Sequence, residues 1–387
     1  MEFSRRLKKL PPYLFVEIDR KKKELIEKGV DVINMGVGDP DLPTPEHIVQ
    51  AGQEALKNPK YHQYPFGPGM RIFRQAIAQW YKKRFDVTLD PEKEIHSLIG
   101  SKEGIGHLPL AFVNPGDVVL VPDPGYPVYK TGTIFAGGIP YYLPLLEKND
   151  FLPDLRKIPS KILKRTKILF LNYPNNPTSA TATKKFFIEV VKFAKKYNII
   201  VAHDAAYSEI YFNENNPPIS FLSVPGAKDI GIEFHSLSKT YNMTGWRCGW
   251  VCGNENIVKG LSTVKDNYDS GLFSAIQYAG VVALTDSQEC VEKNRKIYRE
   301  RRDTLYYGLK KLGWKLKKPE ATFYLWARTP SGKSSIETSE KLLTSAGVVA
   351  TPGVGLGDSG EGYIRFALTV DVNRIKEALN RISKIHW

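Results

Sequence analysis

Apolar and polar positions along the chain follow two patterns, a helical period and short continuous apolar runs. The helical period predicts helices at 16–28, 45–56, 70–85, 184–197, 287–312, 336–346 and 371–385. The apolar and β-branched runs predict strands at 118–121, 167–171, 199–203, 231–236 and 249–252, and two later strands at 322–327 and 363–368. Because helices and strands alternate, we expect an α/β protein.

The strands predicted at 167–171, 199–203 and 231–236 are almost continuously apolar. Such runs are typical of parallel strands that are covered by helices on both faces. A polar cluster follows each of them, and ligands of open α/β sheets bind at the carboxyl ends of the strands. We therefore expect a mostly parallel central sheet with a functional site at that edge.

The length of 387 residues points to more than one domain, because a single core usually stops growing near about 250–300 residues. The late helices and strands predict a smaller α+β domain at 285–387. We expect an N-terminal segment at 1–45 to join it and a large domain at 46–284. Apolar residues make up 42% and charged residues 25% of the chain, which excludes a disordered protein, and three cysteines exclude a disulfide scaffold.

The net charge of +14 is spread along the chain. No arginine–glycine repeat, zinc-finger spacing or basic tail accompanies it, so we expect a solvated basic surface and no nucleic-acid partner. No apolar run approaches the roughly 20 residues of a membrane helix, and the first residues lack the apolar region of a signal peptide. We expect a cytoplasmic protein with no membrane partner. The histidines and cysteines have no metal-ligand spacing, so no metal is expected.

The segment 236–247 combines two serines, a lysine and an arginine directly after an apolar strand. Burial at a strand end would lower the pKa of Lys239 and make its neutral amine available as a nucleophile. The hydroxyls of Ser236 and Ser238 and the guanidinium of Arg247 could hold a phosphate. The alternative is an exposed lysine in an ordinary loop.

A second cluster follows the strand predicted at 199–203. Burying Asp204 there is costly unless a cation is present, and a protonated pyridine nitrogen would be such a cation. Tyr207 could donate its hydroxyl to a neighbouring oxygen. The alternative is an aspartate that caps the next helix.

Two further clusters and one helix start carry weaker signals. The segment 172–178 is a turn-forming run after a strand, and a plain turn is the alternative. The segment 100–104 precedes an apolar run with helical character, so its backbone N–H groups and Lys102 could bind an anion, or it could be an ordinary capped helix start. Thr44 is predicted to cap the helix at 45–56, with Pro45 in the first helical position.

Together these segments resemble the class I/II aminotransferases, which are fold-type I enzymes that use pyridoxal 5′-phosphate. The resemblance spans nearly the whole chain and rests on Tyr64, Gly69, Arg74, 100–102, 124–127, 175–178, Asp204, Tyr207, 236–239, Arg247 and Arg365. It implies a large domain around a mostly parallel sheet and a smaller α+β domain. It also implies ping-pong transamination between an amino acid and a 2-oxo acid, in a homodimer whose subunits share their active sites.

The resemblance assigns roles to individual residues. The catalytic residues would be Lys239, which holds the cofactor covalently and moves the substrate proton, Asp204, which keeps the ring nitrogen protonated, and Tyr207. The cofactor-binding residues would be these three with Ser101, Lys102, Tyr126, Asn176, Ser236, Ser238 and Arg247, joined across the dimer by Tyr64 and Ser270. The substrate-binding residues would be Tyr13, Gly38, Lys102, Tyr126, Asn176 and Arg365, of which the arginine takes the α-carboxylate.

Within that family, the segments 34–45, 112–117 and 122–129 look like the LL-diaminopimelate aminotransferases. This similarity implies transfer from LL-diaminopimelate to 2-oxoglutarate, a reaction of lysine biosynthesis. Many members carry a glutamate shortly after the partner-subunit tyrosine, whereas the run after Tyr64 contains no acid. Ser179 stands where the family's turn motif usually has glycine, and we expect only a local change in the turn.

Three other functions stay open. The missing glutamate leaves room for an aspartate- or alanine-type or another amino-acid aminotransferase. A C–S lyase would share Lys239 and Asp204 but would need no 2-oxo acid. A non-catalytic regulator could also be built on this fold, although the intact lysine argues against it.

Overall fold

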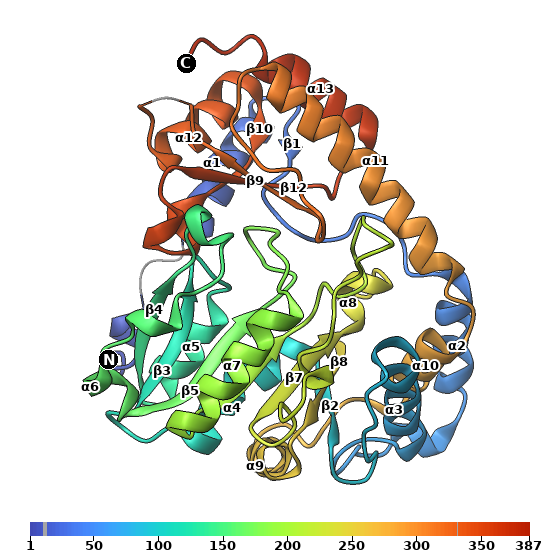
Figure 1. Cartoon of the computed structure of the whole chain (residues 1–387). Coiled ribbons are helices and arrows are strands. Elements are labelled where there is room, and N and C mark those ends of the chain that lie inside the picture. Colours follow the sequence, from blue (N-terminus) through green and yellow to red (C-terminus); the bar gives the residue numbers. More distant parts are fainter. Residues whose placement is uncertain (11–13, 331) are drawn as a thin grey trace.

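The structure is a computed structural model that describes residues 1–10, 14–330 and 332–387 (Figure 1). Its centre is a seven-stranded sheet, with the strands in the order β2-β8-β7-β6-β5-β3-β4. These strands are β2 (Ile95–Ile99), β8 (Cys248–Gly253), β7 (Gly231–Ser236), β6 (Ile200–Asp204), β5 (Thr166–Asn172), β3 (Val118–Asp123) and β4 (Ile139–Pro144). The neighbours β5, β6 and β7 are parallel, whereas β8 is antiparallel to both β7 and β2. The predicted mostly parallel sheet is confirmed.

Helices cover both faces of this sheet, as the continuous apolar strands predicted. Leu169 of β5 belongs to a buried cluster with side chains of α3 (Arg71–Phe85) and α7 (Lys184–Tyr197). The next residue, Phe170, belongs to a cluster on the other face with α4 (Ser101–Phe112), α5 (Val128–Phe135) and α9 (Glu255–Asp266). Beyond α3 lie α10 (Ser274–Thr285) and α2 (Glu46–Leu56), which pack against each other. Two short helices, α6 (Ser160–Leu163) and α8 (Leu237–Thr240), complete this part.

A second group of elements lies above the central sheet in Figure 1. It contains an antiparallel sheet in the order β11 (Thr351–Pro352), β12 (Tyr363–Ala367), β9 (Tyr324–Arg328), and the parallel pair β1 (Ile33–Asn34) and β10 (Val348–Val349). Its helices are α1 (Leu14–Glu27), α11 (Glu289–Lys311), α12 (Ser335–Ala346) and α13 (Val372–Ile382). Ile33 and Met35 share one buried cluster with Leu325 and Phe366, so the two ends of the chain pack together. The domain boundaries at 45 and 285 stay a prediction.

Two local predictions are wrong. Thr44 does not cap α2, because its hydroxyl donates to the carbonyl oxygen of Asn242 at 2.9 Å and the residue before the helix is Pro45, without a side-chain cap. The strand predicted from residue 322 begins at Tyr324, because Thr322 has a φ of 65°, outside the extended region. Among the described helices, none has both the length and the apolar composition that crossing a membrane requires.

Candidate functional site

A cavity of about 440 Å³ lies where the carboxyl ends of β5, β6 and β7 face β9 and β12. The predicted site residues that line it are Gly38, Ser101, Lys102, Tyr126, Asn176, Asp204, Tyr207, Ser236, Ser238, Lys239, Arg247 and Arg365. Two predicted residues, Tyr64 and Ser270, do not line it, and the side chain of Tyr64 is 77% exposed. Tyr13 lies outside the described residues.

Lys239 enters the cavity from the short helix α8, which follows β7 directly. The Ser236 hydroxyl caps this helix by accepting a hydrogen bond from the Ser238 N–H at 3.1 Å. The Lys239 amine donates to the carbonyl oxygen of Gly38 at 3.0 Å. Burial lowers the pKa of Lys239 to about 8, and the charge of Asp39 opposes this shift. A neutral, nucleophilic amine is therefore accessible near neutral pH.

Asp204 ends β6 at the floor of the cavity and is only 4% exposed. Its carboxylate accepts hydrogen bonds from the Tyr129 hydroxyl at 2.8 Å and the Ala206 N–H at 3.3 Å. Burial raises the pKa of Asp204, and the hydrogen bonds from Tyr129 and Ala206 oppose this shift only in part. A cationic ring nitrogen in the cavity would offset this cost, so the residue fits the implied cofactor.

The opposite end of the cavity suits a phosphate. Arg247 lies against Gly100 so closely that a Cβ at Gly100 would sit 2.5 Å from its guanidinium nitrogen. Ser101 begins α4 at this point, so the N-terminal end of that helix lies beside the guanidinium. The Ser238 Oγ atom is buried and has no hydrogen-bond partner among the described residues. A phosphate oxygen would satisfy that hydroxyl and pair with the arginine.

Arg365 is a buried arginine held by neutral groups. It donates to the Asn176 side-chain oxygen at 2.8 Å, the Gly36 carbonyl at 2.7 Å and the Thr351 hydroxyl at 3.2 Å. It is 5% exposed, and no described carboxylate pairs with it. A buried charge without a counter-ion is costly, so the arrangement is suited to binding a ligand carboxylate.

Several residues of the cavity were missed by the sequence analysis. Tyr324 lies between Tyr207, whose hydroxyl is 3.1 Å from its own, and Arg365, whose guanidinium carbon is 4.5 Å from its ring centre. Tyr324 falls in the apolar strand predicted at 322–327, and no neighbouring sequence pattern indicates a function for its hydroxyl. Asp39 lines the cavity, is exposed and forms no ion pair with a described residue. Its position one residue after Gly38 could have drawn attention to it.

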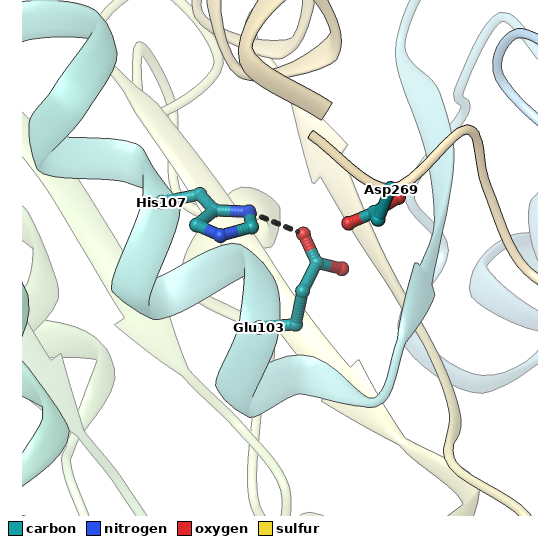
Figure 2. Close-up of side chains that lie close together, drawn as sticks. All are labelled: Glu103, His107 and Asp269. Carbon is teal, nitrogen blue, oxygen red and sulfur yellow. Dashed lines mark hydrogen bonds and ion pairs between the residues drawn. The ribbon is translucent and has the colours of Figure 1, made fainter. Parts of the chain in front are cut away.

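A separate polar cluster joins α4 to the segment after α9 (Figure 2). Glu103, His107 and Asp269 place ligand atoms within 4.8 Å of one another, a spacing that could hold a metal ion. The ammonium of Lys265, however, already contacts both acids, at 2.9 Å from each, and it is 1% exposed. We therefore interpret this cluster as an internal ion-pair network.

The chain matches the family model described as "Aminotransferase class I and II" over residues 30–382. It is 58% identical to the LL-diaminopimelate aminotransferase of Aquifex aeolicus, over 99% of each chain. It is also 58% identical to the LL-diaminopimelate aminotransferase of Maridesulfovibrio salexigens, over 98% of each chain. Among solved structures, substrate-bound BacF from Bacillus subtilis is similar, with a TM-score of 0.95 and 40% identity over 99% of this chain and 98% of that one.

Proposed function

The chain belongs to the class I and II aminotransferases, and from this premise we propose that it is a pyridoxal 5′-phosphate-dependent LL-diaminopimelate:2-oxoglutarate aminotransferase of lysine biosynthesis. The observation that carries the proposal is the cavity that gathers Lys239, Asp204 and the unpaired Arg365. The names of relatives at 58% identity support the choice of substrate.

The cofactor would lie between the two ends of the cavity. Ser101, Ser238 and Arg247 would hold its phosphate, and Asp204 would pair with its ring nitrogen. Asn176 and Tyr207 would donate hydrogen bonds to its ring oxygen, and Tyr126 would stack on the ring. When bound, pyridoxal 5′-phosphate supplies an electron-withdrawing ring that activates the Cα–H bond of the substrate.

Two groups of the chain would act on the substrate directly. Arg365 would bind the α-carboxylate as a bidentate fork and so orient the Cα–H bond. Lys239 would remove the Cα proton with its neutral amine and return a proton in the second half of the reaction. The lowered pKa of Lys239, about 8, suits this exchange because both protonation states are accessible near neutral pH.

The distal end of LL-diaminopimelate carries a second ammonium and a second carboxylate. The exposed carboxylate of Asp39 lines the cavity and would receive the distal ammonium, in place of the glutamate that is absent after Tyr64. Lys102, which is also exposed and lines the cavity, would meet the distal carboxylate. The cavity would thus offer one group of each sign to the distal end of the substrate.

A homodimer completes the proposal. Tyr64, Phe66 and Tyr268 are exposed by 77%, 75% and 68%, which is unusual for such large aromatic side chains. A partner subunit would cover them, and Tyr64 and Ser270 would reach the partner's cofactor phosphate. The cytoplasmic location stays a prediction.

Single-turnover spectroscopy of the cofactor-loaded enzyme tests the substrate. The panel contains LL- and meso-diaminopimelate, aspartate, glutamate, alanine and aromatic amino acids. We expect fast conversion with LL-diaminopimelate and glutamate and slow conversion with aspartate. Fast conversion with aspartate or alanine and none with diaminopimelate would instead support the alternative aminotransferase. Cleavage of an S-alkylcysteine to a thiol, ammonia and pyruvate without a 2-oxo acid would support the lyase.

The variant Asp39→Asn tests the distal contact. It should lower kcat/KM for LL-diaminopimelate by about three- to fivefold, the size expected for one exposed ion pair. Glutamate has no distal ammonium, so its half-reaction should stay within about twofold and serves as an internal control. Asp39→Glu keeps the charge and should behave like the wild type. Equal losses for both substrates would remove Asp39 from substrate recognition.

A further inference from the structure

Two buried residues behind the cavity, Ser179 and Thr322, have left-handed backbones, with φ of 61° and 65°. They are 5% and 0% exposed. Residues with a Cβ rarely adopt this conformation, and for a β-branched threonine it is a true outlier. Their hydroxyl oxygens lie 2.9 Å apart although they are 143 positions apart in the chain. Such strain persists only where surrounding contacts hold it, and it concentrates at functional sites.

The two hydroxyls complete a closed hydrogen-bond circuit around the main chain of Tyr324. Ser179 donates to the Tyr324 carbonyl at 2.7 Å, and the Tyr324 N–H donates to the Thr322 hydroxyl oxygen at 3.1 Å. Each hydroxyl has one proton, so the threonine hydroxyl must donate to Ser179. Tyr324 and Ala367 face each other as a non-hydrogen-bonded pair of the β9–β12 ladder, because the bond from the Leu368 N–H to the Phe323 carbonyl at 2.8 Å marks the adjacent hydrogen-bonded pair. The main-chain N–H and C=O of Tyr324 therefore point to the outer edge of β9. The circuit therefore satisfies the main-chain N–H and carbonyl of Tyr324, as hydrogen bonds to a further strand would.

Tyr324 in turn shapes the site. A Cβ on Gly38 would lie 1.9 Å from its hydroxyl oxygen, and its ring lies 4.5 Å from the guanidinium carbon of Arg365. One of the hydrogen-bond acceptors of Arg365 is Asn176, three residues before Ser179 in the same turn. Ser179 thus connects two of the segments that contact the arginine, the turn with Asn176 and the strand with Tyr324.

We propose that Ser179 and Thr322 are positioning residues for substrate binding, which lock Tyr324 and the turn with Asn176 in one register and so orient Arg365. The inference rests on the proposed function, in which the arginine binds the substrate α-carboxylate. It gives a role to the serine that replaces the family's usual glycine, where the sequence predicted only a local change in the turn.

Four variants of the holoenzyme test this role. Ser179→Ala and Thr322→Val remove one hydroxyl each, and both should raise KM for the amino donor and for the 2-oxo acid by about fivefold, as expected for one lost hydrogen bond. Both substrates bind through an α-carboxylate, so kcat should stay within about twofold. Thr322→Ser keeps the hydroxyl and should restore the wild-type KM. Ser179→Gly relieves the strain of the left-handed backbone but lacks the hydroxyl, so its KM should rise as in Ser179→Ala.

Hydrogen–deuterium exchange of residues 322–328 provides a readout besides activity. The amide hydrogens should exchange faster in Ser179→Ala and Thr322→Val and at the wild-type rate in Thr322→Ser. Loss of thermal stability with unchanged KM would overturn the proposal, as would a Ser179→Gly variant with the wild-type KM. If the wild type transaminates no amino acid, the proposed function fails separately. Calorimetric binding of glutarate then decides the role of the hydroxyls: weaker binding in Ser179→Ala supports it, and equal affinity overturns it.

Discussion

The amine of Lys239 donates a 3.0 Å hydrogen bond to the main-chain oxygen of Gly38, a residue 201 positions earlier in the chain. Gly38 must be glycine there because a Cβ would collide with the Tyr324 hydroxyl. The segment after β1 therefore forms a wall of the cavity, and it holds the amine at a defined place opposite β9.

The pKa of Lys239 leads to a pH prediction. Burial lowers this pKa to about 8, so the amine is protonated below that pH and neutral above it. The rate at which the apoenzyme combines with pyridoxal 5′-phosphate should therefore rise with pH and level off above about pH 8. Stopped-flow absorbance measures this rate. A midpoint near 10.5, the ordinary value for lysine, would contradict the buried amine.

The same measurement has a matched pair of variants. The negative charge of Asp39 stabilises the protonated amine, so Asp39→Asn should move the midpoint to lower pH. Asp39→Glu keeps the charge and should leave the midpoint unchanged.

Arg365→Ala should raise KM for every amino donor. Hydrogen bonds to charged groups contribute about 1.5–3 kcal/mol, so we expect an increase of roughly 10- to 100-fold in steady-state assays. Arg328→Ala is the control, because this arginine lies on β9, is half exposed and pairs with Glu147 away from the cavity. Unchanged KM in Arg365→Ala would place the carboxylate site elsewhere.

Tyr64 allows a test of shared active sites. If Tyr64 acts in the partner's site, Tyr64→Ala and Lys239→Ala subunits should complement each other. A mixed dimer has one site with both residues intact, so an equal mixture should regain about a quarter of wild-type activity. The assay is activity after subunit exchange. A mixture no more active than its separate components would show that each subunit works alone.

Lys265→Met should destabilise the fold without changing the residues that line the cavity. Lys265 is buried between Glu103 and Asp269, and removing it leaves Asp269 without its cation and Glu103 with only its His107 contact. Breaking a buried pair in this way costs about 3–5 kcal/mol, to be measured as the free energy of unfolding in denaturant at pH 7. Lys259→Met is a control on the exposed face of the same helix. A loss below about 1 kcal/mol would mean that the network contributes little.

Five of the seven strands of the central sheet could be predicted because each is a local apolar run, and the polar residues at their ends could be predicted with them. Asp204 and Lys239 each follow such a run, and parallel strands bring their carboxyl ends to the same edge. Both edge strands were missed. Strand β4 has only one buried residue and contains Pro140 and Pro144, and proline is uncommon in strands. The apolar run of β2 is interrupted by His96 and Ser97.

The local sequence determined most of the chemical groups that reach the cavity, because they lie at strand ends and turns that form within short segments. Tertiary structure decided how those groups are held. Only packing between distant segments gives Arg365 neutral partners, places Tyr324 over Gly38 and closes the hydroxyl circuit of Ser179 and Thr322. These contacts join residues more than a hundred positions apart. The left-handed backbones that they stabilise are also disfavoured by the local sequence, so no local pattern predicts them.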